Sequence, residues 1–72
     1  MNNYQQVFKF DNGYGASVIS NDMSYGGSKG LFEVAVLDSD GNIVYNTPVA
    51  GDVIGWLDFA GVADILNKIK AL

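Results

Sequence analysis

The chain has 72 residues with no cysteine and no histidine, and eight acidic residues against four lysines give a net charge of −4. This length is enough for one domain and not for two, so we expect residues 1–72 to fold as a single domain. The composition excludes disulfides and the commonest zinc ligands, and the few scattered lysines argue against direct nucleic-acid binding.

The chain also lacks the sequence features of a membrane or exported protein. No apolar run approaches the ~18 residues that a membrane helix needs. The first residues have neither the basic region nor the apolar region of a signal peptide. We therefore expect a cytoplasmic protein that has no membrane contact and no cofactor.

The first expected element is a β-hairpin. Residues 4–10 and 14–20 are rich in aromatic and β-branched residues, and the Asn-Gly pair between them is typical of a two-residue type I′ turn. This turn places Phe8 opposite Ser17 and leaves open which face of the hairpin is buried. A Gly- and Ser-rich loop is predicted to follow at residues 21–30.

A second hairpin is expected from residues 31–37 and 43–47, joined by the Asp- and Gly-containing turn at residues 38–42. Pro48 ends the predicted fourth strand, because proline cannot donate to a sheet ladder. Residues 49–57 are ambiguous between a short strand and a helical turn, and we expect an irregular connector there.

Residues 58–72 predict an amphipathic helix with Asp58 as its N-cap. Apolar residues recur there at helical spacing: Phe59, Val62, Leu66 and Ile69, with Ile65 and Leu72 widening the stripe. A helix this short is marginal alone, so the stripe must pack on the sheet. The predicted fold class is α+β: a four-stranded antiparallel sheet of two hairpins, with one C-terminal helix packed on one face.

The sequence holds no recognisable catalytic group, and we expect no enzyme. Without histidine or cysteine, the usual pairs of nucleophile and base are missing. Most of the acids are aspartates in expected turns, caps or loops, where they serve local hydrogen bonding. The Asp-rich turn at residues 38–42 lacks the terminal Glu and the flanking helices of a calcium loop, so no metal site is expected.

Two sets of residues are candidates for binding. The first contains side chains that are enriched at protein interfaces, with covering of the core as the alternative. Its members are Met23, Tyr25, Tyr14 and Tyr45. The second set offers backbone amides and a lysine to a small anion, with a plain flexible connection as the alternative. Its members are Gly26, Gly27, Ser28 and Lys29.

Trp56 stands two residues before the expected helix. We expect it to anchor the core at the helix junction, with an interface hot spot as the alternative.

Three segments of the chain resemble small, uncharacterised phage and prophage proteins. They are residues 11–18 (DNGYGASV), residues 25–27 (YGG) leading to residues 30–38 (GLFEVAVLD), and residues 52–57 (DVIGWL). The resemblance implies a small protein that works inside a bacterial host cell. It transfers no catalytic or ligand-binding residue. Small phage accessory proteins often bind host factors, including defence systems such as CRISPR effectors.

The favoured hypothesis is a non-catalytic phage-type accessory protein that binds a host protein and inhibits or redirects it. An anti-defence factor, such as an anti-CRISPR protein, is one example of such a protein. The alternatives are a binding module for a small anionic ligand, such as a signalling nucleotide, and a structural subunit of a homo-oligomer. A homodimer is expected in any case, through an edge strand or the open sheet face. That face is predicted to expose Leu31, Ala35, Leu37, Ile43 and Tyr45.

Overall fold

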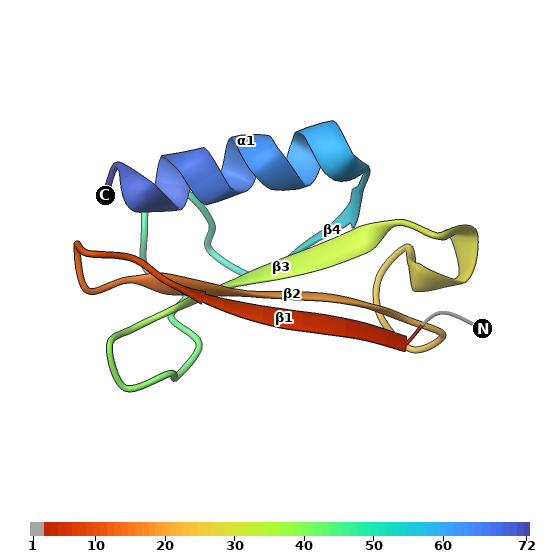
Figure 1. Ribbon diagram of the computed structural model, residues 1–72, viewed down its shortest axis with the longest axis horizontal. Coiled ribbons are helices and arrows are strands. Elements are labelled where there is room, and N and C mark those ends of the chain that lie inside the picture. The colour runs from red at the N-terminus through yellow and green to blue at the C-terminus, as the bar shows by residue number, and fades with distance from the viewer. Residues whose placement is uncertain (1–2) are drawn as a thin grey trace.

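The computed structural model describes residues 3–72 and contains one sheet and one long helix. Its elements are β1 (Asn3–Lys9), β2 (Gly15–Asn21), the short 3-10 helix η1 (Gly27–Lys29), β3 (Phe32–Leu37), β4 (Ile54–Leu57) and α1 (Phe59–Lys70). The strands form an antiparallel sheet in the order β1-β2-β3-β4, and α1 lies across one face of it (Figure 1). The predicted α+β fold class is confirmed.

The loop of the first hairpin contains three residues, not the two that were predicted. The N–H of Phe10 donates to the carbonyl oxygen of Tyr14 at 2.9 Å, and Gly13 has the positive φ, 88°, that such loops need at their last position. Asn12 favours this loop, because its Oδ1 accepts the N–H of Tyr14 at 3.0 Å while its Nδ2 donates to the carbonyl oxygen of Ile69 at 2.8 Å.

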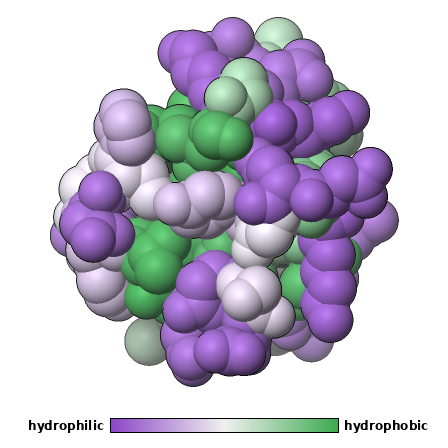
Figure 2. Space-filling model, turned by 90° about the vertical axis from the view of Figure 1, so that its left-hand side faces the viewer, coloured by the Kyte–Doolittle hydropathy of each residue, from purple (hydrophilic) through white to green (hydrophobic). Residues whose placement is uncertain are grey.

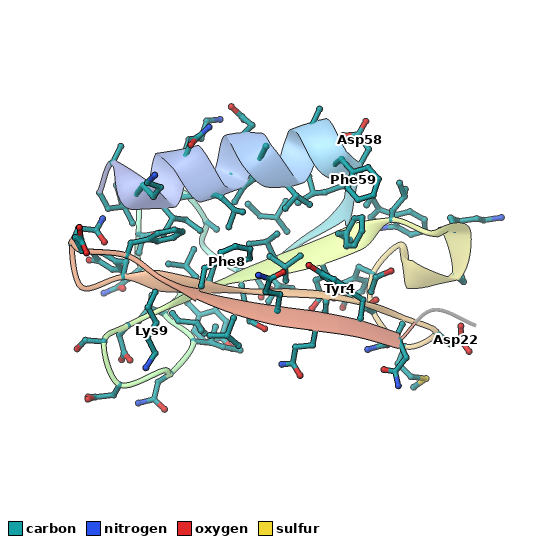
Figure 3. The ribbon with its side chains drawn as sticks, viewed as in Figure 1. Tyr4, Phe8, Lys9, Asp22, Asp58 and Phe59 are labelled. Carbon is teal, nitrogen blue, oxygen red and sulfur yellow. The ribbon has the colours of Figure 1, made fainter. Side chains whose placement is uncertain are left out.

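The longer loop shifts the register between β1 and β2 by one residue. Phe8 pairs with Ala16, so the predicted pairing with Ser17 is wrong. Because side chains alternate along a strand, this shift also decides which face is buried. Figure 3 shows Phe8 on the face under α1. Ala16 and Val18 belong to the buried cluster on that face, and alternation along β1 puts Val7 on the opposite face.

The strand predicted at residues 43–47 is wrong. Of that segment, Ile43 makes only an isolated bridge, to Leu37. The ladder does not continue past this bridge, and the chain bends at residues 47–49, around Pro48. The free edge of β3 is taken instead by β4, which comes from the segment expected to be an irregular connector.

Helix α1 begins as predicted, with Asp58 as its N-cap, and the carboxylate Oδ1 accepts the N–H of Gly61 at 2.8 Å. The helix packs mainly on β2, β3 and β4. Ile69 is fully buried, whereas Phe59 at the start of the predicted stripe is 80% exposed. The buried cluster between helix and sheet consists of Ala16, Val18, Val34, Val36, Ala50, Ile65 and Ile69. Within residues 3–72, no helix is long and apolar enough to cross a membrane.

The apolar patch predicted on the face away from α1 is mostly wrong. Ala35 and Leu37 are buried, at 7% and 6% exposure. The segment after β3 folds back below the sheet, on the side away from the helix (Figure 1). Only Ile43 and Tyr45 of the predicted patch stay exposed, so this face does not present a broad apolar surface.

Candidate functional site

Three large side chains are exposed on the loop between β2 and β3 and on β4, the strand that this loop contacts at Tyr25. Met23 is 94% exposed and Tyr25 is 62% exposed, both in the loop. Trp56, in β4, is 60% exposed, so its predicted role as a core anchor is wrong. We call these three residues the loop patch.

Backbone contacts hold Tyr25 beside Trp56. The N–H of Trp56 donates to the carbonyl oxygen of Tyr25 at 3.2 Å. The N–H of Tyr25 in turn donates to a carboxylate oxygen of Glu33, on β3, at 3.0 Å. The loop is therefore attached to two strands of the sheet at the residue that carries the exposed tyrosine ring.

Two glycines allow the loop and β4 to come this close. A Cβ on Gly26 would lie 2.9 Å from the Cα of Trp56, and Gly26 also has a φ of 87° that side chains rarely adopt. A Cβ on Gly55 would overlap the Cβ of Tyr25. The position of the loop patch therefore depends on two places where only glycine fits.

The start of the loop is fixed by hydrogen bonds around Asn21. Its side-chain Oδ1 accepts the N–H of Met23 at 2.8 Å, and its carbonyl oxygen accepts the N–H of Ser24 at 3.2 Å. The hydroxyl of Ser24 accepts the N–H of Asn21 at 2.9 Å in return. This segment is thus a series of hydrogen-bonded turns, and it presents Met23 and Tyr25 from a defined backbone.

Trp56 has a backbone conformation that is unusual for a bulky residue. Its φ is 59°, and it is the one non-glycine residue with positive φ among residues 3–72. Such a conformation costs on the order of 1–3 kcal/mol and is concentrated at functional positions. Trp56 lies where the register between β3 and β4 shifts, between the pairs Phe32–Leu57 and Val34–Ile54, so its conformation belongs to an irregularity of the sheet that the local sequence does not mark.

The anion-binding candidates Gly26, Gly27, Ser28 and Lys29 lie in and beside η1. The N–H of Gly27 donates to the carbonyl oxygen of Ser24 at 3.1 Å, and the N–H of Lys29 donates to that of Gly26 at 3.0 Å. These two amides are therefore used by the turns of the loop itself. Ser28 and Lys29 are exposed, whereas Gly26 and Gly27 are buried.

The structure does not bring Tyr14 and Tyr45 to the loop patch. Tyr14 precedes β2 and the loop follows it, so a seven-residue strand, about 23 Å long, lies between them. Tyr14 is half-buried against the core. Tyr45 follows Ile43, which pairs at the far end of β3. Figure 2 faces this end of the molecule and shows a mostly hydrophilic surface with small apolar areas.

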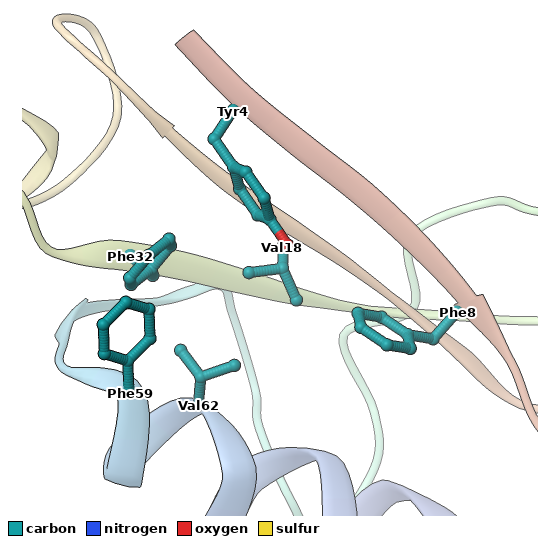
Figure 4. Close-up of a pocket in the computed structure, with 6 residues that line it drawn as sticks. All are labelled: Tyr4, Phe8, Val18, Phe32, Phe59 and Val62. Carbon is teal, nitrogen blue, oxygen red and sulfur yellow. The ribbon is translucent and has the colours of Figure 1, made fainter. Parts of the chain in front are cut away.

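A second surface feature, which the sequence did not predict, is an apolar groove between β1 and α1 (Figure 4). Its volume is about 250 Å³, and we call it the β1 groove. It forms because α1 packs mainly on the other three strands and leaves β1 projecting. The ring of Phe32 links its two sides, with ring centroids 5.5 Å from Tyr4 and 5.2 Å from Phe59. The lining residues are Tyr4, Phe8, Val18, Phe32, Phe59 and Val62.

Comparisons of this chain with protein-family models, with curated proteins and with solved structures find no match. In the part of the chain that the structure describes, no group of three or more acidic side chains is placed to hold a metal ion. A functional proposal therefore rests on the two apolar surfaces, the loop patch and the β1 groove.

Proposed function

We propose that this chain is a non-catalytic accessory protein that binds a host protein through the loop patch. The observation that carries the proposal is Trp56, a bulky side chain that is exposed although its backbone has positive φ.

A residue with φ near 59° would be better accommodated as glycine, which has no Cβ to clash in this region. The strain of about 1–3 kcal/mol is large for a domain of this size, whose core supplies only about 3–5 kcal/mol. The ring of Trp56 does little to offset it, because most of its surface faces solvent. A tryptophan at this position is therefore better explained by a contact outside the chain than by folding.

The chemistry of the loop patch suits a protein partner. Tryptophan and tyrosine dominate interface hot spots, and methionine supplies an apolar contact that adapts to the partner's shape. The backbone at Tyr25 and Trp56 is already fixed by hydrogen bonds, so binding does not have to order the loop. We expect the partner to offer an apolar pocket for the ring of Trp56.

The resemblance to phage proteins indicates what kind of protein the partner is. On that basis the partner is a protein of the bacterial host cell. We propose that it is a defence factor, such as a CRISPR effector. Binding of the loop patch would inhibit or redirect that factor without any chemical step.

Affinity capture from bacterial lysate, followed by titration of the purified partner, tests this proposal. Trp56→Ala should weaken binding by about 30-fold or more, as expected for a hot-spot tryptophan. Tyr45→Ala is the matched control, because Tyr45 is a similarly exposed aromatic residue outside the loop patch. The proposal fails if the captured protein binds both variants as it binds the parent chain.

A further inference from the structure

β1 is an outer strand of the sheet, and one of its sides has no partner strand within residues 3–72. All seven of its residues pair with β2 in an unbroken register. Outer strands are commonly protected by proline, by a β-bulge or by several charges. β1 contains neither proline nor a bulge, and Lys9 is its one charged residue. It therefore remains able to pair with another strand.

The hydrogen-bond pattern shows which groups face the free side. Phe10 donates to Tyr14, so this pair is a hydrogen-bonded one, and such pairs alternate along an antiparallel ladder. The even-numbered residues of β1 therefore bond to β2. The N–H and C=O groups of the odd-numbered residues, at positions 3, 5, 7 and 9, point to the free edge.

The sequence of β1 is complementary to itself in one antiparallel register. A two-fold axis through Gln6 places Gln5 of one copy opposite Val7 of the other. Both positions are odd-numbered, so their free N–H and C=O groups face each other and can form hydrogen bonds. The same axis places Asn3 opposite Lys9, so the register uses every residue of the strand.

The β1 groove adds an apolar contact to this pairing. Tyr4 and Phe8 both line the groove, and the axis places Tyr4 of one copy opposite Phe8 of the other. These are non-hydrogen-bonded positions, at which side chains approach most closely. Tyr4, 42% exposed in the single chain, becomes covered by an aromatic neighbour, and the two grooves join across the axis.

Charge also favours a second copy as the occupant. None of the eight acids lies in β1, although the chain as a whole carries a net charge of −4. The two Lys9 residues would lie at opposite ends of the paired strands, so no like charges face one another. We infer that a second copy of this chain occupies the free edge of β1 and closes the β1 groove, giving a continuous sheet across a two-fold axis.

Pairing of one short strand buries less than the ~1,600 Å² of a standard interface, so we expect micromolar affinity. Sedimentation equilibrium should show a mass approaching twice 7.7 kDa at high micromolar concentration. A mass that stays at 7.7 kDa at this concentration overturns the inference and leaves the edge to a strand of another protein.

Single cysteines test the register directly, because the chain has no cysteine of its own. The two copies of Gln6 face each other on the axis, with Cα atoms about 4.5 Å apart, which a disulfide can span. The two copies of Gln5 would be about 8 Å apart, which is too far. Both glutamines are exposed residues of the same strand, so the variants are matched.

Under mild oxidation, Gln6→Cys should form a covalent dimer within minutes, whereas Gln5→Cys should remain mostly monomeric. Circular dichroism of both variants verifies that they are folded. Equal cross-linking at the two positions, or a dimer that does not cross-link at position 6, would refute pairing through β1 in this register. This outcome is independent of the loop patch, whose test measures binding to a different protein.

Discussion

The side-chain amide of Asn12 donates a hydrogen bond to the carbonyl oxygen of Ile69 at 2.8 Å, although the two residues are 57 positions apart in the chain. The same nitrogen lies 3.1 Å from the carbonyl oxygen of Lys70 and 3.2 Å from that of Leu72. The last carbonyl groups of a helix have no partner within it. The tip of the first hairpin therefore supplies the donor that closes the C-terminal end of α1.

We predict that Asn12→Asp destabilises the fold more than its conservative size suggests. The substitution replaces the donating amide with a carboxylate that faces carbonyl oxygens at the negative end of the helix dipole. The loss should be about 1–2 kcal/mol, because the repulsion between the carboxylate and the carbonyl oxygens adds to the lost hydrogen bond. Urea denaturation measures it. The neighbouring exposed variant Asp11→Asn should stay within about 0.5 kcal/mol of the parent. Equal stability of the two variants would show that this contact contributes nothing.

Ile69 and Leu66 provide a second prediction. Both belong to the predicted apolar stripe, but Ile69 is fully buried while Leu66 is half-buried. Ile69→Ala should therefore cost about 2–5 kcal/mol, enough to unfold so small a domain, and Leu66→Ala should cost less. Ile69→Val keeps the effect measurable, at about 0.5–1.5 kcal/mol in thermal or urea unfolding. An Ile69→Ala variant as stable as Leu66→Ala would show that the helix docks through a different face.

The elements that sequence reasoning found correctly are those encoded by neighbouring residues. The turn residues Asn12 and Gly13 predict the first hairpin. Asp58, followed by apolar residues at helical spacing, predicts α1. Strand patterns followed by one amphipathic helix are enough to predict the α+β class with a helix on one sheet face, although the second hairpin itself was wrong. Met23 and Tyr25 were also identified as exposed candidates for binding, and both are exposed.

The errors concern contacts between distant parts of the chain. The register of β1 depends on Asn12, whose partner Ile69 lies at the other end of the sequence. Two segments compete for the free edge of β3, and their local patterns do not show that Ile54 pairs there while Ile43 makes only a bridge. Trp56 likewise lies at the register shift between β3 and β4, and a tryptophan two residues before a predicted helix does not indicate its exposure.

A third prediction concerns the backbone of Trp56. At ordinary strand positions, glycine is less stable than alanine by about 0.5–1 kcal/mol. At a φ of 59° this order should reverse, because alanine keeps the Cβ clash and glycine removes it. Trp56→Gly should therefore be more stable than Trp56→Ala by about 1 kcal/mol in urea unfolding. If alanine is the more stable, Trp56 is not strained, and the main support for the proposed binding role is lost.

The last prediction separates the two ways in which a glycine is required. Gly41 has a φ of 86° with open space around it, so Gly41→Ala should cost only the backbone strain, about 1–2 kcal/mol. Gly55 is not among the residues with positive φ, yet its added Cβ would overlap the Cβ of Tyr25. Gly55→Ala should therefore cost about 1–3 kcal/mol by overpacking.

The two glycine variants should differ most in the loop patch. Gly55→Ala must push Tyr25 away from β4, so the hydrogen bond between the N–H of Trp56 and the carbonyl oxygen of Tyr25 should lengthen or break. Trp56 is the single tryptophan, which makes its fluorescence a direct report on this contact. We expect a changed emission maximum and weaker partner binding for Gly55→Ala, and neither change for Gly41→Ala. The same emission in both variants would mean that the loop does not depend on its close approach to Gly55.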